Sequence, residues 1–157
     1  MNSIMAGVAA GVLGTITMDS LNHLFARKGL IIKIDIRMIG RMSAGWANGR
    51  FCFRDPGQMK QIAHEVLLGY LTHYAIGIAL AIPFVLGWSL LVGDPVSPIW
   101  TLAYGIATTA ASVFVVHPSM GLGVFGMRSP EGIRAPLSSL ANHLFFGIGM
   151  AVGVALT

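Results

Sequence analysis

Charged residues are scarce in this chain, at 10% of its 157 residues, against about 25% in ordinary soluble domains. Hydrophobic residues make up 55%, and the mean hydropathy is +0.75. With so few charges the chain cannot cover a water-soluble globule, so most of its surface must face lipid. The length allows one domain of about four membrane spans of roughly 20 residues each, with one substantial loop. It excludes a second, soluble domain.

Cysteine and several common site motifs are also lacking. Cys52 is the only cysteine, which excludes an internal disulfide and says little about the compartment. No His-Glu-x-x-His zinc motif is present, and the glycine-rich stretch 117–130 lacks the Gly-Lys-Ser ending of a phosphate-binding loop. The nine methionines form no Met-x-x-Met ladder, which disfavours copper transport along methionines.

Four hydrophobic stretches predict antiparallel membrane spans at about residues 4–26, 59–88, 99–116 and 136–156. Pro83 should kink or end the second helix. The third should stop at His117-Pro118, because the residue before a proline disfavours helical backbone, and Pro136 suits the first turn of the fourth. The predicted fold is all-α: one transmembrane domain, residues 1–157, that forms an integral membrane four-helix bundle.

All ten Lys and Arg residues lie in the connections that follow the first and third spans. The connection between the second and third spans carries only Asp94 as a charged residue. By the positive-inside rule, the two basic connections lie in the cytoplasm and both termini lie on the non-cytoplasmic side. The sequence therefore predicts a multi-pass membrane protein with a long basic cytoplasmic loop between spans 1 and 2.

This long loop, about residues 27–60, is too long to be a mere connector. Its apolar residues are interleaved with Lys33, Arg37 and Arg41, which predicts a short helix in the headgroup region with basic residues against anionic lipid. The alternative is a basic lid over the site that can hold an anionic ligand. Nucleic-acid binding is disfavoured because the basic residues are few. The apolar residues are Ile34, Ile36, Met38, Ile39, Met42 and Trp46.

The five histidines lie at a similar depth, here called the histidine level, when the chain is folded across a membrane. His23 closes the first hydrophobic stretch, His64 and His73 open the second, His117 closes the third and His143 opens the fourth. Ionisable groups at this depth are costly in lipid, so such a cluster indicates a functional site. The predicted ligand-binding residues are Asp19, Asn22, His23, Glu65, His73, Asn142 and His143.

A short internal repeat supports the prediction of a common depth. Residues 22–25, Asn-His-Leu-Phe, recur at 142–145, and a glycine-rich stretch lies on the outer side of each copy. In antiparallel spans this reversed order puts both copies at one depth, and small residues allow close helix contact. We expect spans 1 and 4 to touch along their outer halves and to open into a polar pocket at their inner ends. Chance is the other explanation of the repeat.

Several of these side chains can also ligate a metal ion. Asp19 lies one helical turn before His23 and can orient its imidazole, although such a pair can equally serve only to join helices. Oxygen and imidazole ligands suit Zn²⁺, Fe²⁺ or Mn²⁺. A haem between His73 and His143 is less favoured. The candidate metal ligands are Asp19, His23, Glu65, His73 and His143, whereas His64 is expected to face headgroups.

These residues predict a protein that binds a metal ion or a small polar ligand in the cytoplasmic half of the bundle. An enzyme acting on an amphiphilic substrate is one version of this function. A proton-coupled small-molecule transporter would use the same residues as a proton relay. A non-catalytic accessory subunit of a membrane complex, or a homo-oligomer, would use them to satisfy one another's hydrogen bonds.

Four motifs give the chain a family resemblance. They are Gly11-x-x-Gly-Thr-x-x-Met-Asp19, Glu65-x-x-x-Gly69-x-x-x-His73-Tyr74-x-x-Gly77, Pro118-x-x-Gly121-x-Gly123 and Asn142-His143-x-x-Phe146-Gly147. The chain resembles, over nearly its whole length, a family of small four-span bacterial inner-membrane proteins classed as a domain of unknown function. The resemblance implies an all-helical bacterial inner-membrane protein and supplies no activity, substrate or cofactor.

Overall fold

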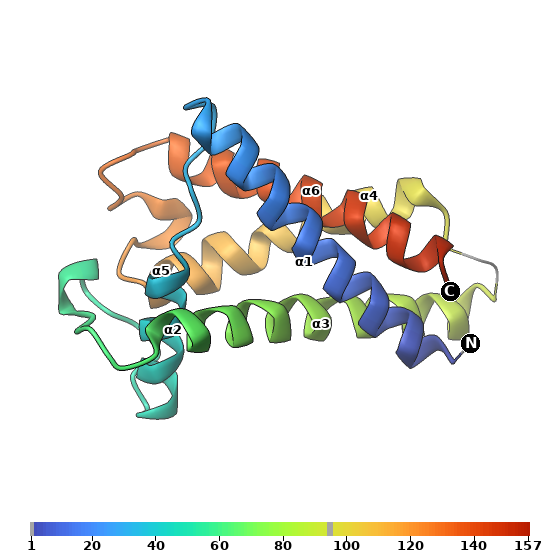
Figure 1. The fold of residues 1–157 in the computed structure, drawn as a ribbon, viewed down its shortest axis with the longest axis horizontal. Coiled ribbons are helices and arrows are strands. Elements are labelled where there is room, and N and C mark those ends of the chain that lie inside the picture. Colours follow the sequence, from blue (N-terminus) through green and yellow to red (C-terminus); the bar gives the residue numbers. More distant parts are fainter. Residues whose placement is uncertain (1, 94–95) are drawn as a thin grey trace.

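The computed structural model describes residues 2–93 and 96–157, and this part of the chain is helical without strands. Four helical segments are long and apolar enough to cross a membrane: α1 (Ser3–Arg27), α3 (Glu65–Leu91), Pro98–Ser119 and α6 (Arg134–Ala155). Figure 1 shows an elongated bundle with both termini at one end and α2 at the other. The prediction of an all-α bundle is confirmed, and the chain is a multi-pass membrane protein.

The second span differs from its predicted bounds. The chain at Met59 is still part of the loop, where its side chain is buried, and the helix begins six residues later at Glu65. At the other end α3 continues through Pro83 as far as Leu91, so the proline does not end it. A proline leaves carbonyls of the preceding turn without their usual partners. One turn before Pro83, the Tyr104 hydroxyl donates a hydrogen bond of 2.7 Å to the Leu80 carbonyl.

The prediction that the third span stops at His117-Pro118 is wrong. Helix α4 (Pro98–Ala111) continues into a π-helical turn, η2 (Ser112–Val116), and then into α5 (His117–Ser119). The backbone of His117 is helical, with φ −58° and ψ −49°, and its N–H bonds to the Ser112 carbonyl. In an α-helix the proline ring would clash with the carbonyl four residues before it. The π turn joins residues five apart, which moves this carbonyl away from the ring. The helix therefore continues past the proline to Ser119.

The loop between α1 and α3 contains the predicted short helix. Helix α2 (Ile36–Ala47) is capped by Asp35, whose carboxylate accepts hydrogen bonds from the N–H groups of Arg37 and Met38. It crosses α3 where Gly40 and Gly69 leave no room for side chains: a Cβ on Gly40 would overlap the Glu65 carbonyl oxygen. A 3₁₀ turn, η1 (Pro56–Gln58), follows in the same loop, and another, η3 (Val124–Gly126), lies in the loop before α6.

The apolar face of α2 is covered by protein. Ile39 and Met42 are buried against Phe53, Met59 and Met120. Together these five side chains form a second hydrophobic core, separate from the main core between the spans. The expectation that these apolar side chains reach the lipid headgroup region is therefore wrong for Ile39 and Met42. The loop folds over the end of the bundle as a cap, because its apolar residues find partners in the loop before α6.

Helices α1 and α6 pack along their whole length. A Cβ on Gly153 would lie 2.5 Å from the Ala10 Cα, and Gly14 contacts the Phe146 ring, so the glycines allow the predicted close approach. At the inner ends the rings of Phe25 and Phe145 stack with centroids 5.4 Å apart. The two spans therefore stay together at their inner ends, while residues of both, such as Met18 of α1 and His143 of α6, line a cavity shared with the other spans.

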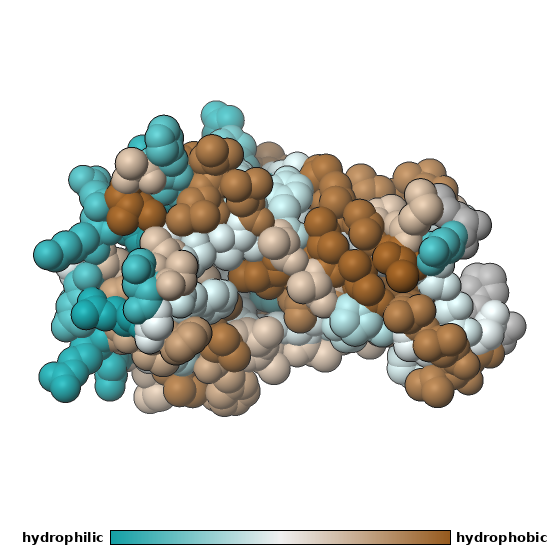
Figure 2. All heavy atoms as spheres, turned by 90° about the horizontal axis from the view of Figure 1, so that it is seen from below, coloured by the Kyte–Doolittle hydropathy of each residue, from teal (hydrophilic) through white to brown (hydrophobic). Residues whose placement is uncertain are grey.

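Hydrophilic residues gather at one end of the molecule, as Figure 2 shows, while much of the remaining length is hydrophobic. We call this end, which holds α2 and the two basic loops, the basic end. Every Lys and Arg except Arg41 is exposed. Both termini lie at the opposite end (Figure 1), so the predicted segregation of the basic residues from the termini is confirmed.

Candidate ligand-binding cavity

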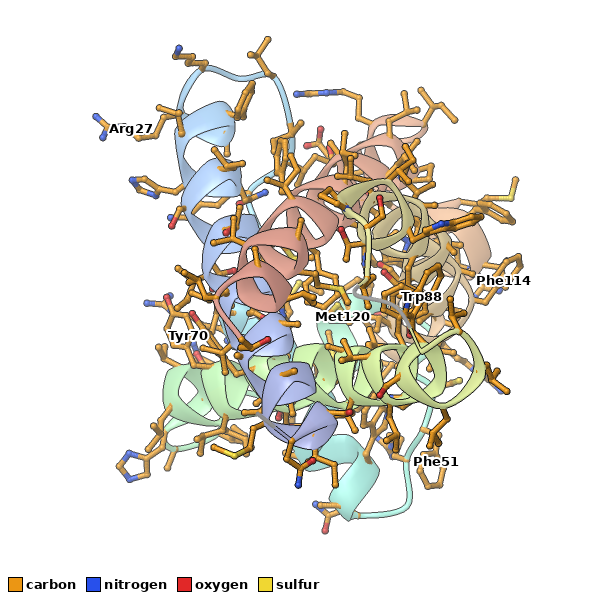
Figure 3. All side chains as sticks on the ribbon, turned by 90° about the vertical axis from the view of Figure 1, so that its right-hand side faces the viewer. Arg27, Phe51, Tyr70, Trp88, Phe114 and Met120 are labelled. Atoms are coloured by element: carbon orange, nitrogen blue, oxygen red, sulfur yellow. The ribbon has the colours of Figure 1, made fainter. Side chains whose placement is uncertain are left out.

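A cavity of about 420 Å³ lies in the half of the bundle nearest the basic end. A volume of this size fits a small organic molecule. In the view along the bundle, Met120, which lines the cavity, lies among the long helices, whereas Phe114 points away from them (Figure 3). Most of the lining is apolar and comes from all four spans and from α2: Met18, Met38, Ile39, Met42, Ile76, Leu80, Val116, Met120, Leu122 and Phe146.

Three histidines from three different helical segments line this cavity: His73 of α3, His117 of α5 and His143 of α6. The Nε2 atom of His73 lies 3.0 Å from Oδ1 of Asp19 on α1. A carboxylate oxygen can only accept, so Nε2 of His73 carries the proton of this bond. The pair is mostly shielded, with side-chain exposed fractions of 15% for His73 and 24% for Asp19.

The tautomer of His143 follows from its contact with Thr108. The Thr108 hydroxyl donates to the Gly105 carbonyl at 2.6 Å and lies 2.8 Å from Nδ1 of His143. The hydroxyl has a single proton, and two oxygens only 2.6 Å apart need that proton between them, so Nδ1 of His143 donates the second bond. Nε2 of His143 is then the unprotonated nitrogen, and it has no hydrogen bond to any residue that the structure describes.

His117 contributes a second nitrogen without a partner. Its side chain is 9% exposed, and its Nδ1 atom is buried with no hydrogen-bond partner in the described ranges. Gly126, which has φ +66°, holds the following loop against this ring: a Cβ there would lie 3.1 Å from Nδ1. A buried imidazole nitrogen without a partner is costly in a folded protein unless a ligand or water satisfies it.

One wall of the cavity is an extended segment between α1 and α2, residues 32–35, which we call the strap. The amide of Asn22, which is 3% exposed, donates to the Ile32 carbonyl at 2.9 Å and accepts from the Ile34 N–H at 3.1 Å. The same amide donates to Oδ1 of Asn142 at 3.0 Å, and the Ile32 N–H bonds to the Ser138 hydroxyl at 2.9 Å. The strap is thus fastened to α1 and α6 together.

Glu65 lies outside this cavity and holds α2 in place. Its carboxylate accepts two hydrogen bonds from Arg41, from Nε at 2.7 Å and from Nη2 at 3.1 Å, while Nε of Arg37 lies 3.9 Å away. The hydrogen bond to this carboxylate raises the pKa of Arg41 above its usual value. The ion pair sits beside the contact of Gly40 with the Glu65 backbone, so it fixes the same helix crossing.

A model of one protein family matches this chain over residues 8–157, and its description is "Protein of unknown function (DUF2938)". The chain belongs to this family. The match confirms the resemblance to a family classed as a domain of unknown function, and it adds no activity. No curated protein and no solved structure matches the chain significantly.

The predicted site residues fall into separate groups. Asp19 and His73 form one pair, Asn22 and Asn142 a second, and Glu65 binds Arg41. Of the predicted residues, His73, Asn142 and His143 line the cavity, whereas His23 is exposed, as is His64, which was expected to face headgroups. Among residues 2–93 and 96–157, no three His, Cys, Asp or Glu side chains form a group that could hold a metal ion. The metal site therefore stays a prediction from the sequence.

Sequence reasoning missed several residues of the cavity. His117 belongs to the predicted histidine level but was not predicted to bind a ligand, and its place beside Pro118 and the glycine-rich stretch was the available signal. Ser112 and Ser139 also line the cavity and are joined by a 2.8 Å hydrogen bond between their hydroxyls. No pattern in the sequence singled out Thr108, because a threonine in an apolar helix usually bonds only to its own backbone.

Proposed function

We propose that this protein binds a small, mainly apolar molecule with one or two polar groups in the cavity at the basic end. The observation that carries the proposal is an apolar cavity of about 420 Å³ into which three spans bring three histidines. Ligand sites typically combine an apolar lining with a few polar groups that fix orientation. Each of these histidines has a ring nitrogen that lacks a protein partner in the described part of the chain.

The charges around the cavity favour an uncharged ligand. Asp19 is already paired with His73, and Glu65 with Arg41, so neither carboxylate is available to a cation. Lys33 and Asp35 line the cavity where the strap reaches the exposed surface, and they carry opposite charges. An ion inside the apolar lining would lack a counter-charge, which makes its burial costly. An amphiphile of the kind that dissolves in a bilayer meets no such cost.

Filling the cavity tests the proposal. Ile76 lines it from α3, so Ile76→Trp is expected to weaken the binding of 1-tetralol or 1-tetralone at least tenfold by occupying their space. Binding is measured by equilibrium dialysis of protein in lipid nanodiscs against empty nanodiscs. Ile148→Trp is the matched control, because Ile148 is 39% exposed and does not line the cavity. Uptake no greater than that of empty nanodiscs for both probes contradicts the proposal.

We further propose that the protein lies in a bacterial inner membrane with its basic end in the cytoplasm. The support is the positive-inside rule applied to two loops that, with the helix ends beside them, contain all ten basic residues. The exposed basic side chains at this end would meet anionic headgroups, each contributing about 1 kcal/mol near the surface. The lipid-facing sides of the four spans can contact a membrane partner or a second copy of the chain.

Reporter fusions test this orientation. A fusion after Thr157 is expected to be active only with a reporter that works outside the cytoplasm, because the C-terminus lies opposite the basic end. A fusion within the loop between α2 and α3, after Gly57 in η1, should require a cytoplasmic reporter. A cytoplasmic C-terminus would reverse the orientation and would place the cavity on the outer side.

A further inference from the structure

We infer that the cavity selects a molecule that donates a hydrogen bond, an alcohol or a phenol, over a ketone or ether of the same size. The inference rests on the proposed function and deepens it, because it names the chemical class of the ligand. It is carried by the contact of His143 with Thr108, which fixes the nitrogen of His143 that remains for a ligand.

His143 faces the cavity as an acceptor. Its Nδ1 proton is directed to the Thr108 hydroxyl, whose own proton is directed to the Gly105 carbonyl at 2.6 Å. This chain of two bonds leaves only the lone pair of Nε2 for a molecule in the cavity. A hydroxyl group can donate to that lone pair. A carbonyl or ether oxygen has no proton to give and would leave Nε2 desolvated without a partner.

The other histidines and the serines of the cavity do not reverse this preference. The Nε2 proton of His73 is directed to Asp19, so it is not available to a ligand carbonyl, and the unprotonated Nδ1 of the same ring can only accept. The serine hydroxyls can rotate and act as donor or acceptor, and His117 has no bond that fixes its tautomer in the described part of the chain. These groups accept an alcohol and a ketone alike. Discrimination between the two therefore falls to His73 and His143, and of these His143 is the one whose tautomer Thr108 fixes.

Thr108 is a positioning residue in this arrangement. Thr108→Val removes the acceptor of the Nδ1 proton, so His143 loses the contact that fixes its tautomer and can present an N–H to the ligand. Thr109→Val is a closely matched control one residue away. The Thr109 hydroxyl is buried and has no hydrogen-bond partner among the residues described, so its removal leaves no group unsatisfied. Thr108→Ser keeps the hydroxyl and should restore the preference.

The test uses 1-tetralol and 1-tetralone, which differ in one oxygen function and have nearly the same shape. Their affinities are measured on nanodisc-embedded protein, corrected for partition into empty nanodiscs. The parent, Thr109→Val and Thr108→Ser proteins should bind the alcohol about tenfold more tightly than the ketone. Thr108→Val should lower this ratio. Equal affinities in the parent, or an unchanged ratio in Thr108→Val, overturn the inference while the proposed function stands. Absence of saturable binding of both probes in the parent removes the proposed function and the inference together.

A second measurement reads the tautomer in the parent protein and needs a variant only to assign the signal. In protein labelled with ¹⁵N-histidine, the nitrogen shifts distinguish a protonated from an unprotonated ring nitrogen, and His143→Gln identifies the signal. The parent is expected to show His143 with its proton on Nδ1. A signal with the proton on Nε2 contradicts the inference regardless of the binding data.

Discussion

Gly149→Val is expected to lower the free energy of unfolding by about 3 kcal/mol, the upper end of the cost of overpacking a core. A Cβ at this position on α6 would overlap the Leu13 carbonyl oxygen and would lie 2.7 Å from the Gly14 Cα on α1. These neighbours are backbone atoms, which cannot move aside as a side chain can. The two helices would have to separate along the contact that joins the first and last spans.

Gly87→Val is the matched control for this substitution. Gly87 lies within α3, and a Cβ there would meet no heavy atom within 4 Å among the described residues. We expect its free energy of unfolding to change by less than about 0.5 kcal/mol. Unfolding of both variants in detergent, followed by circular dichroism, gives the comparison. Equal stability of the two variants would mean that α1 and α6 are not in backbone contact.

Asn22→Leu is expected to release the strap from the bundle. The change removes three hydrogen bonds at a position that is 3% exposed, and it leaves the Ile32 carbonyl, the Ile34 N–H and the Asn142 side chain without this partner. Together these losses cost about 3 kcal/mol. Because the strap can detach while the spans stay folded, the cost should appear as local opening. The Ile34 amide should then exchange its hydrogen roughly a hundredfold faster.

His23→Leu provides the comparison for Asn22→Leu. His23 follows Asn22 on the same helix but is exposed, and no hydrogen bond of its side chain is present among the described contacts. Its replacement should leave exchange at Ile34 within about twofold of the parent. If both variants show the same protection at Ile34, Asn22 does not hold the strap. Amide exchange resolved by mass spectrometry or NMR distinguishes these results.

Much of the fold could be predicted from composition and periodicity, because the bilayer restricts a spanning chain to helices or a closed barrel. Long charge-free stretches and the distribution of basic residues place the spans near 4–26 and 136–156, close to α1 and α6. The errors lie where tertiary contacts decide. The second span was expected to begin at Met59, but this side chain is buried by Phe53 and Met120 instead of by lipid.

The site was only partly predictable for a related reason. The histidine level is visible in the sequence because it depends on distance from the ends of the spans, and His73 and His143 do line one cavity. The partner of each side chain depends on helix rotation, which the sequence does not specify. Asp19 could serve His23 on its own helix or a residue on another, and the structure pairs it with His73. The strap has no periodic pattern, so its bonds to Asn22 could not be foreseen.

The way the strap is fastened also determines when during synthesis the cavity can be completed. A ribosome makes the strap together with α1, but Asn142 lies 120 residues beyond its partner Asn22. At about 5 to 20 residues per second, roughly 6 to 24 s pass between the two. During that time the Ile32 N–H also lacks its bond to Ser138. The newly made chain must therefore keep the strap in water or against the membrane surface, and the wall of the cavity closes only when the last helix is inserted.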